Sequence, residues 1–300
     1  MPGMEPDITA QRVRWEGFSI PPLSATFADM VRLMNQPELI EVRRVVEIIG
    51  RDPAVTARIL RIVNSAYYGL RARVGTVEHA VVLLGAEATV GFVIGMGIIN
   101  MRRHFHPTMR HLVLHLIRHL VATGALAGQI AQLAHLATAQ GRGLEFTAGL
   151  LHDLGKIVLL YNVPDRYQTL CGASRQEACA EEESAFGLNH AELGALLAEQ
   201  WAFPEALVEA IRWHHCPEEA PPAYRPIAQV VHLADTAAYR MGLGFHAGEE
   251  AIADSELAKR WEKACGPNVP AFEELFRHLE SGKPQLHQFV DTLLGSDREP

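Results

Sequence analysis

The chain has 300 residues, of which 48% are hydrophobic and 21% are charged, and its formal net charge is −8. This is the composition of a globular protein long enough to bury one large core or two smaller ones. The acidic balance argues against partners such as nucleic acid or an anionic membrane, because both require clustered Lys and Arg.

The cysteines and the apolar runs bear on the cellular compartment. Four cysteines are scattered without a C-x-x-C pair, which is typical of reduced thiols; we expect Cys216 to be buried. The first 17 residues are polar and lack the apolar segment of a signal peptide. The longest uncharged apolar run, residues 88–101, is shorter than the roughly 20 residues that span a bilayer. We therefore expect a cytoplasmic protein without a membrane segment.

The first third of the chain has the pattern of short helices separated by tight polar breaks. Apolar residues at helical spacing predict helices at 24–34, 42–49, 53–63, 77–84 and 86–101. Ser24 and Asp52 are suited to cap the first and third of these, and Pro53 suits a first helical position. We expect residues 1–19 to form a loose lead-in and residues 20–105 to form an N-terminal helical lobe.

Pro107 marks the start of a second group of helices, which we place in residues 106–245. The predicted helices are 109–139, an uninterrupted one at 145–161, one capped by Asn189, one from Pro204 to about 213, and 227–239. Residues 246–300 are predicted to form a C-terminal extension of two or three helical pieces around Gly266-Pro267. The last six residues are predicted to be disordered.

Polar residues on apolar helical segments carry the chemistry. They are His119, His152, Asp153, His190, His214, His215 and Asp235. A buried carboxylate needs a cation, hydrogen-bond donors or a metal, and a helical bundle can point side chains from several helices into one pocket. Imidazole and carboxylate ligands together suit iron, manganese, zinc, cobalt or nickel. The set exceeds the needs of one ion, which leaves room for a two-metal site.

Each of these residues also has a simpler interpretation. Any single histidine could be a hydrogen-bonded core or surface residue, and the His152-Asp153 pair alone could be a helix-capping Asp beside a core His. Of His214 and His215, one could be a ligand and the other a supporting donor. Lys156 could contact a phosphate oxygen or pair with the helix end. We expect three further histidines to be structural or supporting: His111, His115 and His232.

The order of these residues resembles the HD superfamily of helical metal-dependent phosphohydrolases, and most closely its HDOD branch, the HD-related output domain. In the N-terminal part the resemblance is carried by IPPL (20–23), RDP (51–53), VNSAYYG (63–69) and AVVLLG (80–85). In the second part it is carried by LHDLGK (151–156), WAFP (201–204), WHH (213–215) and HLAD (232–235). It covers about residues 20–245.

The resemblance implies an all-α, two-lobed protein with an N-terminal helical lobe and an HD-type helical bundle. HD phosphohydrolases use the His-Asp pair to hold a metal that activates water against a phosphate ester, whereas HDOD proteins are generally signalling or regulatory modules. The related HD-GYP phosphodiesterases carry a Gly-Tyr-Pro motif after their paired histidines. Here His215 is followed by Cys216-Pro217, which argues against cleavage of cyclic di-GMP.

We expect a regulatory output module that binds one or two divalent metal ions. Iron and manganese are favoured, and zinc is a further candidate. Its partner would be a protein of a signalling pathway, with a nucleotide or phosphate as an additional ligand. The alternative is a metal-dependent phosphohydrolase acting on a nucleotide or cyclic dinucleotide, in which Asp153 and Lys156 would be catalytic. A third hypothesis treats the histidines as core residues without a metal.

Overall fold

The computed structural model describes residues 18–36, 38, 40–134, 143–170, 175–245, 258–259, 261 and 271–294. Within these ranges the chain forms α-helices and short 3-10 turns and contains no strand, so the all-α prediction is confirmed. The predictions for residues 1–17, for Gly266-Pro267 and for the last six residues lie outside the described part of the chain.

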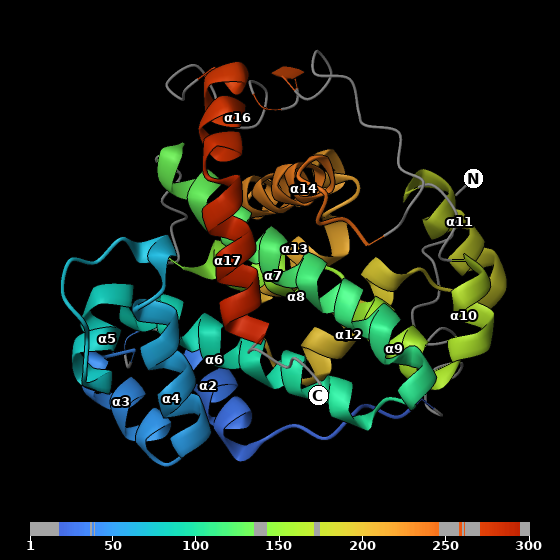
Figure 1. Ribbon diagram of the computed structural model, residues 1–300. Coiled ribbons are helices and arrows are strands. Elements are labelled where there is room, and N and C mark those ends of the chain that lie inside the picture. Colours follow the sequence, from blue (N-terminus) through green and yellow to red (C-terminus); the bar gives the residue numbers. More distant parts are fainter. Residues whose placement is uncertain are drawn as a thin grey trace.

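The N-terminal helices gather on one side of the molecule (Figure 1). They are α2 (Ala25–Met34), α3 (Val42–Gly50), α4 (Pro53–Val63), α5 (Val77–Leu84) and α6 (Ala86–Met101), with the turns η2 (Ala66–Tyr68) and η3 (Arg102–His104). Both predicted caps form: Ser24 Oγ accepts the Phe27 amide at 3.2 Å, and Asp52 Oδ1 accepts two amides at 2.9 and 3.1 Å. Local sequence therefore determines where these helices begin.

The second group is arranged around α7 (Arg110–Leu133), which packs on α8 and α14. Its members are η4 (Pro107–Met109), α8 (Leu144–Leu151), α9 (Leu154–Asn162), α10 (Pro164–Leu170), α11 (Arg175–Phe186), α12 (His190–Gln200), α13 (Glu205–Trp213), η5 (Pro217–Glu219) and α14 (Arg225–Arg240). The predicted cap of α12 forms, since Asn189 Oδ1 accepts the Glu192 amide at 3.0 Å.

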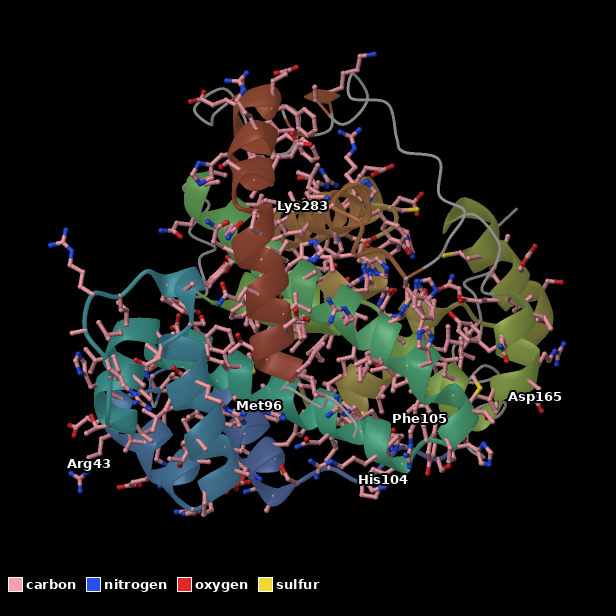
Figure 2. All side chains as sticks on the ribbon, in the orientation of Figure 1. Arg43, Met96, His104, Phe105, Asp165 and Lys283 are labelled. Carbon is pink, nitrogen blue, oxygen red and sulfur yellow. The ribbon has the colours of Figure 1, made fainter. Side chains whose placement is uncertain are left out.

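One apolar core continues through both groups of helices. α6 connects them, because it packs on α2 on one side and on α8 on the other. Its glycines make this possible: a Cβ at Gly95 would lie 2.8 Å from Leu150 Cδ2 of α8. Figure 2 shows the resulting division, with Arg43 and Asp165 extending outward and Met96, 2% exposed, inside the molecule. The glycine-rich apolar run at 88–101 is thus a core helix.

α7 is the described segment that most resembles a membrane span. With η4 it covers Pro107–Leu133 and is apolar and long enough to cross a bilayer, but 72% of its most apolar window is buried inside the protein. The pair Val77–Leu84 and Ala86–His104 passes the same test only together and bends by 108° between its halves. Such burial is typical of the central helix of a soluble protein.

Three details differ from the sequence predictions. The uninterrupted helix predicted at 145–161 is wrong, since the chain leaves the helix at residues 152–153 and α9 begins anew at Leu154. α14 begins two residues before the predicted start, with Pro226 in its first turn. Cys216 is exposed, and the turn η5 that follows it packs against α13 and α14 through the buried Pro217 instead.

The C-terminal extension contributes α16 (Phe272–Ser281) and α17 (Lys283–Leu294). α17 packs against α7, α4 and η2, so it lies across the junction of the two groups of helices (Figure 1). Its buried residues include Phe289 and Val290. This part of the chain, which the sequence resemblance does not cover, therefore joins both halves of the molecule.

Candidate metal centre

The seven polar residues singled out in the sequence are brought together in the second group of helices. His119 comes from α7, His190 from the first turn of α12, and Asp235 from α14. His152 and Asp153 occupy the break between α8 and α9, and His214 and His215 follow α13. All are buried except His215, which is partly exposed. We call these seven residues the central cluster.

The break between α8 and α9 determines how the side chains of His152 and Asp153 are oriented. His152 stays helical and its Nδ1 donates to the Gly149 carbonyl at 2.7 Å, whereas Asp153 adopts φ −100° and ψ 22°. A Cβ at Gly155 would overlap the His190 carbonyl oxygen and approach Gly194 N at 2.9 Å, so only glycine allows α12 this close. The break therefore turns the Asp153 carboxylate towards His190.

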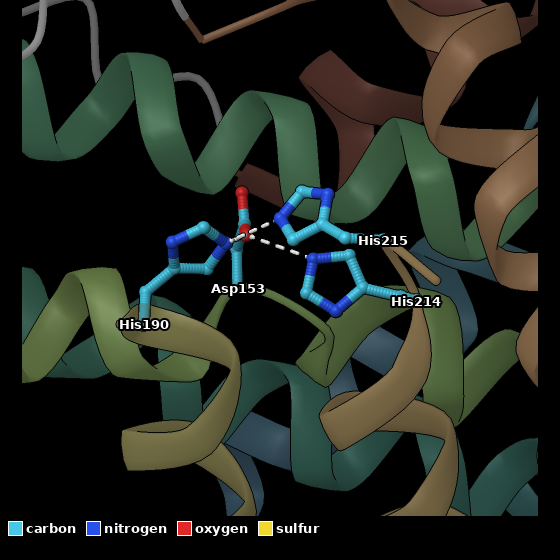
Figure 3. A group of neighbouring side chains, drawn as sticks. All are labelled: Asp153, His190, His214 and His215. Atoms are coloured by element: carbon cyan, nitrogen blue, oxygen red, sulfur yellow. Dashed lines mark hydrogen bonds and ion pairs between the residues drawn. The ribbon is translucent and has the colours of Figure 1, made fainter. Parts of the chain in front are cut away.

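The Asp153 carboxylate is the centre of the cluster. Its Oδ1 lies 3.1 Å from His190 Nε2 and 3.6 Å from His214 Nε2 (Figure 3). Its Oδ2 lies 3.4 Å from His152 Nε2 and 3.7 Å from His119 Nε2. The two carboxylate oxygens therefore face two different sets of imidazoles.

Asp235 and His215 complete these two sets. Asp235 Oδ1 lies 3.1 Å from His119 Nε2 and 3.7 Å from His152 Nε2, on the Oδ2 side of Asp153. His215 Nε2 lies 2.8 Å from His190 Nε2, on the Oδ1 side (Figure 3). Two groups have the composition and compactness of a metal site, namely Asp153 with His190, His214 and His215, and Asp153 with His119 and His152, so Asp153 belongs to both. This geometry can accommodate two ions with a shared carboxylate.

The tautomers of the imidazoles are fixed from outside the cluster. The Nδ1 atoms of His119, His152 and His214 donate to the backbone carbonyls of Leu243, Gly149 and Ile211 at 3.0, 2.7 and 2.7 Å. A carbonyl oxygen only accepts, so each Nδ1 carries the proton and each Nε2 presents a lone pair inward. Outer partners of this kind orient metal-binding histidines.

His190 is oriented by a carboxylate instead of a carbonyl. Glu182 Oε2 accepts from His190 Nδ1 at 2.6 Å and from the His190 amide at 2.7 Å. Its other oxygen accepts from Tyr167 at 2.9 Å. Sequence reasoning missed Glu182, which stands in a run of three acids. Its spacing of four residues from Ala178 and Phe186, on the apolar side of α11, is the signal that could have identified it.

The electrostatics of the cluster favour a cation. Burial disfavours ionisation of Asp153, but the surrounding imidazoles and the Lys156 ammonium hold its pKa well below the usual range. Burial and the nearby His152 lower the pKa of His214 far enough to keep it neutral. Burial alone would lower the pKa of His190, yet the flanking carboxylates raise it, so positive charge is favoured between His190 and Asp153.

Two observations indicate that these ligands suit a divalent metal. The buried carboxylates here are Asp153, Asp235 and Glu182, and Lys156 is the buried ammonium that faces them, so negative charge is in excess. Asp153 Oδ1 and His214 Nε2 are buried and accept no hydrogen bond from described residues, an arrangement that is costly unless a cation lies between such atoms. Borderline metals are the cations that prefer this mixture of ligands.

Lys156 has a single close partner in the cluster. Its ammonium lies 2.8 Å from Asp153 Oδ2, and the side chain is 5% exposed. Burial disfavours the ammonium, but the Asp153 carboxylate outweighs burial and raises the pKa of Lys156 above its usual value. Lys156 therefore fixes the charge of Asp153, and its predicted contact with a phosphate stays a prediction.

The remaining histidines differ in position. His232 Nδ1 donates to the His214 carbonyl at 2.8 Å and so supports the turn that carries His214 and His215. His111 and His115 are exposed on the first turns of α7, with ring centroids 4.5 Å apart, and do not reach the central cluster. The single helix face that carries three histidines thus supplies one, His119, to the site.

Comparison with known proteins agrees with this architecture. The model of the HDOD domain family matches residues 20–217. An HDOD domain protein of unknown function from Geobacter sulfurreducens has 22% identity and a TM-score of 0.79, with 95% of this chain and 97% of that one covered. A protein from Shewanella amazonensis SB2B, provisionally named a phosphohydrolase, has 26% identity and a TM-score of 0.69, with 91% and 95% covered.

Two further proteins are similar to this chain. A protein from Marinobacter aquaeolei VT8, provisionally named for signal transduction, has 19% identity and a TM-score of 0.71, with 95% of this chain and 64% of that one covered. A Treponema pallidum (strain Nichols) protein without an assigned function is 25% identical over 219 residues, which are 72% of this chain but 41% of that protein. Since the family match spans more than half of its residues, this chain belongs to the HDOD family.

Proposed function

We propose that this chain is a regulatory output module of the HDOD type. Its central cluster binds one or two divalent metal ions, iron or manganese before zinc, and occupancy of the cluster controls docking to a protein partner in a signalling pathway. A nucleotide or another phosphorylated small molecule is the expected additional ligand. The main observation that supports this proposal is that inward-facing Nε2 atoms surround both oxygens of the buried Asp153 carboxylate.

Burial favours regulation over turnover. His119, His152 and His214 are 0% exposed, and His215 is the member of the cluster nearest to solvent. A phosphate ester would have to approach the ions from the His215 side, because the other members of the cluster are buried. A structural or sensing ion needs no such access. The provisional naming of the Marinobacter aquaeolei protein for signal transduction supports the same proposal.

The alternative is a metal-dependent phosphohydrolase, and the complete donor set favours it. A bound divalent metal would supply an activated water as nucleophile and polarise the phosphate. Asp153 would hold the metal, and Lys156 would keep that carboxylate ionised. The Shewanella amazonensis protein with a provisional phosphohydrolase name supports this alternative.

Metal analysis of the purified protein tests the shared premise. We expect at least one equivalent of iron, manganese or zinc per chain in the wild type and its loss in Asp153→Ala and in His119→Ala. The variant His111→Ala is the matched control, because that histidine is exposed on the same helix. A metal-free wild type that also fails to take up these ions would leave the core-histidine hypothesis standing instead.

A hydrolysis screen separates the two functions. The metal-loaded protein is assayed with manganese or iron against nucleoside monophosphates, cyclic dinucleotides and a chromogenic phosphate ester. Regulation predicts no turnover and a partner affinity that differs between the metal-loaded and chelated protein. Turnover that disappears in Asp153→Ala would establish the enzyme, and unchanged partner affinity after chelation would refute the regulatory proposal.

A further inference from the structure

A cavity of about 650 Å³ lies where η2, α6, α7, α8 and α17 meet. Its size is within the range of about 300–1,000 Å³ that is usual for small-molecule sites. None of its described lining residues belongs to the central cluster. We call this space the aromatic cavity, after the rings that line it: Tyr67, Tyr68, Phe92, Phe146 and Phe289.

The rings form a continuous wall contributed by both groups of helices and by the C-terminal extension. The ring of Tyr67 lies 4.5 Å from that of Phe289 and 5.2 Å from that of Tyr68. Phe92 continues the wall, with its centroid 6.0 Å from Phe289 and 4.5 Å from Phe146. The faces of such rings carry negative electrostatic potential and attract cations.

Two polar side chains that line the aromatic cavity, Glu145 and Gln129, offer acceptors. Glu145 is 3% exposed, and its Oε2 accepts a hydrogen bond from the Gly143 amide at 3.3 Å. Gln129 Nε2 donates to the Tyr67 hydroxyl at 2.9 Å, which leaves its carbonyl oxygen as an acceptor. A ligand that fits this set must present donors to a carboxylate and an amide oxygen.

Charge complementarity selects among ligand classes. The described lining residues include one carboxylate and no Lys, Arg or His, so these residues offer a partner to a cationic ligand and none to a phosphate or carboxylate. A buried carboxylate beside aromatic faces is the combination that binds organic cations. We propose that the aromatic cavity binds an organic cation on a planar or apolar frame, with the cationic group at Glu145 and the frame against the aromatic wall.

The aromatic cavity and the central cluster share two helices but are separate sites. His119 and Gln129 are ten residues apart on α7, which corresponds to about 15 Å along the helix axis. The first turn of α8 holds Glu145 beside the cavity, and His152 of the cluster directly follows its last residue. Binding in the cavity can therefore be measured whether or not the cluster holds metal, and failure of one proposal does not imply failure of the other.

The test uses two probes of the same shape, benzamidinium and its neutral counterpart benzamide. Isothermal titration calorimetry on the full chain should give saturable 1:1 binding of benzamidinium, with a Kd at least about tenfold lower than for benzamide. Glu145→Gln should reduce that ratio to about one, because the amide keeps the shape and removes the charge. Circular dichroism checks that the variant is folded.

A second pair of variants tests the location. A Cβ at Gly128, which lines the aromatic cavity, would meet only Phe146 Cβ at 3.8 Å, so Gly128→Ala should fold and bind as the wild type does. Gly128→Leu should fill the space and weaken benzamidinium binding at least about tenfold. Equal affinity for both probes, no saturable binding, a preference that survives Glu145→Gln, or binding untouched by Gly128→Leu would each overturn the proposal.

Discussion

The two groups of helices use burial in opposite ways. The N-terminal group, α2 to α6, buries aliphatic residues such as Ile59 and Ile94 and leaves ion pairs such as Arg32–Asp29 at the surface. The second group buries carboxylates, an ammonium and five imidazoles, four of them in the central cluster. Apolar burial stabilises a fold by itself, whereas buried charge is tolerated only with matched partners. Burial therefore stabilises the N-terminal group through apolar packing, whereas in the second group it also requires charge balance.

The largest effect should come from Asp153→Ala. Removing the carboxylate leaves the Lys156 ammonium buried without its partner at 2.8 Å, so the free energy of unfolding should fall by about 3–5 kcal/mol. Denaturant unfolding measures this loss. The counterpart Asp29→Ala removes a carboxylate that pairs at the surface of the N-terminal group, and it should change the same quantity by less than about 1 kcal/mol.

A double variant identifies the cause of that loss. Asp153→Ala with Lys156→Met removes both charges, so much of the lost stability should return while metal binding stays absent. A double variant no more stable than Asp153→Ala would show that the stranded ammonium is not responsible.

Close packing of α9 on α12 should give the next effect. Gly155→Ala puts a methyl group against backbone atoms of α12, which cannot move without displacing His190. We expect a loss of about 1–3 kcal/mol in unfolding free energy together with reduced metal content. Gly50→Ala is the control in the N-terminal group, since no atom lies within 4 Å of a Cβ there. Gly155→Ala with normal stability and normal metal content would refute the role given to this contact.

Glu182→Gln should act on metal affinity more than on folding. The amide cannot accept all three hydrogen bonds that the carboxylate takes, and it lacks the negative charge that holds the proton on His190 Nδ1. We expect metal affinity to fall about 10- to 100-fold in a chelator competition. Glu181→Gln, at the exposed neighbouring position, should leave the affinity unchanged. Equal affinities in the two variants would exclude an orienting role for Glu182.

The contrast between the two groups also explains what the sequence could predict. Ser24 and Asp52 act on amides two or three residues away, so the starts of their helices follow from local pattern. The residues of the central cluster could be collected because polar side chains are rare on apolar helices. The break at residues 152–153 was not predicted, because the apolar pattern runs through it, and the close packing of α9 on α12 beside it involves residues far along the chain.

Glu182 was missed for a related reason. A run of three acids indicates a solvated face, and both Glu181 and Glu183 are indeed exposed. The middle residue points inward because His190 and Tyr167 supply donors for it, and those partners lie eight and fifteen residues away. Local periodicity predicts helices well, but a buried charge is decided by partners that only the folded chain brings near.

The smallest effect should belong to the N-terminal group and should be insensitive to metal. Asp52→Ala removes the carboxylate oxygen that accepts the Ala54 and Val55 amides at the start of α4. The free energy of unfolding should fall by about 1 kcal/mol, by the same amount in metal-loaded and in chelated protein. Since this cap and the central cluster belong to different groups of helices, their effects should add. If the fall in unfolding free energy depended on metal, the cluster would govern the stability of both groups through their shared core. The two groups would then not differ in how burial stabilises them.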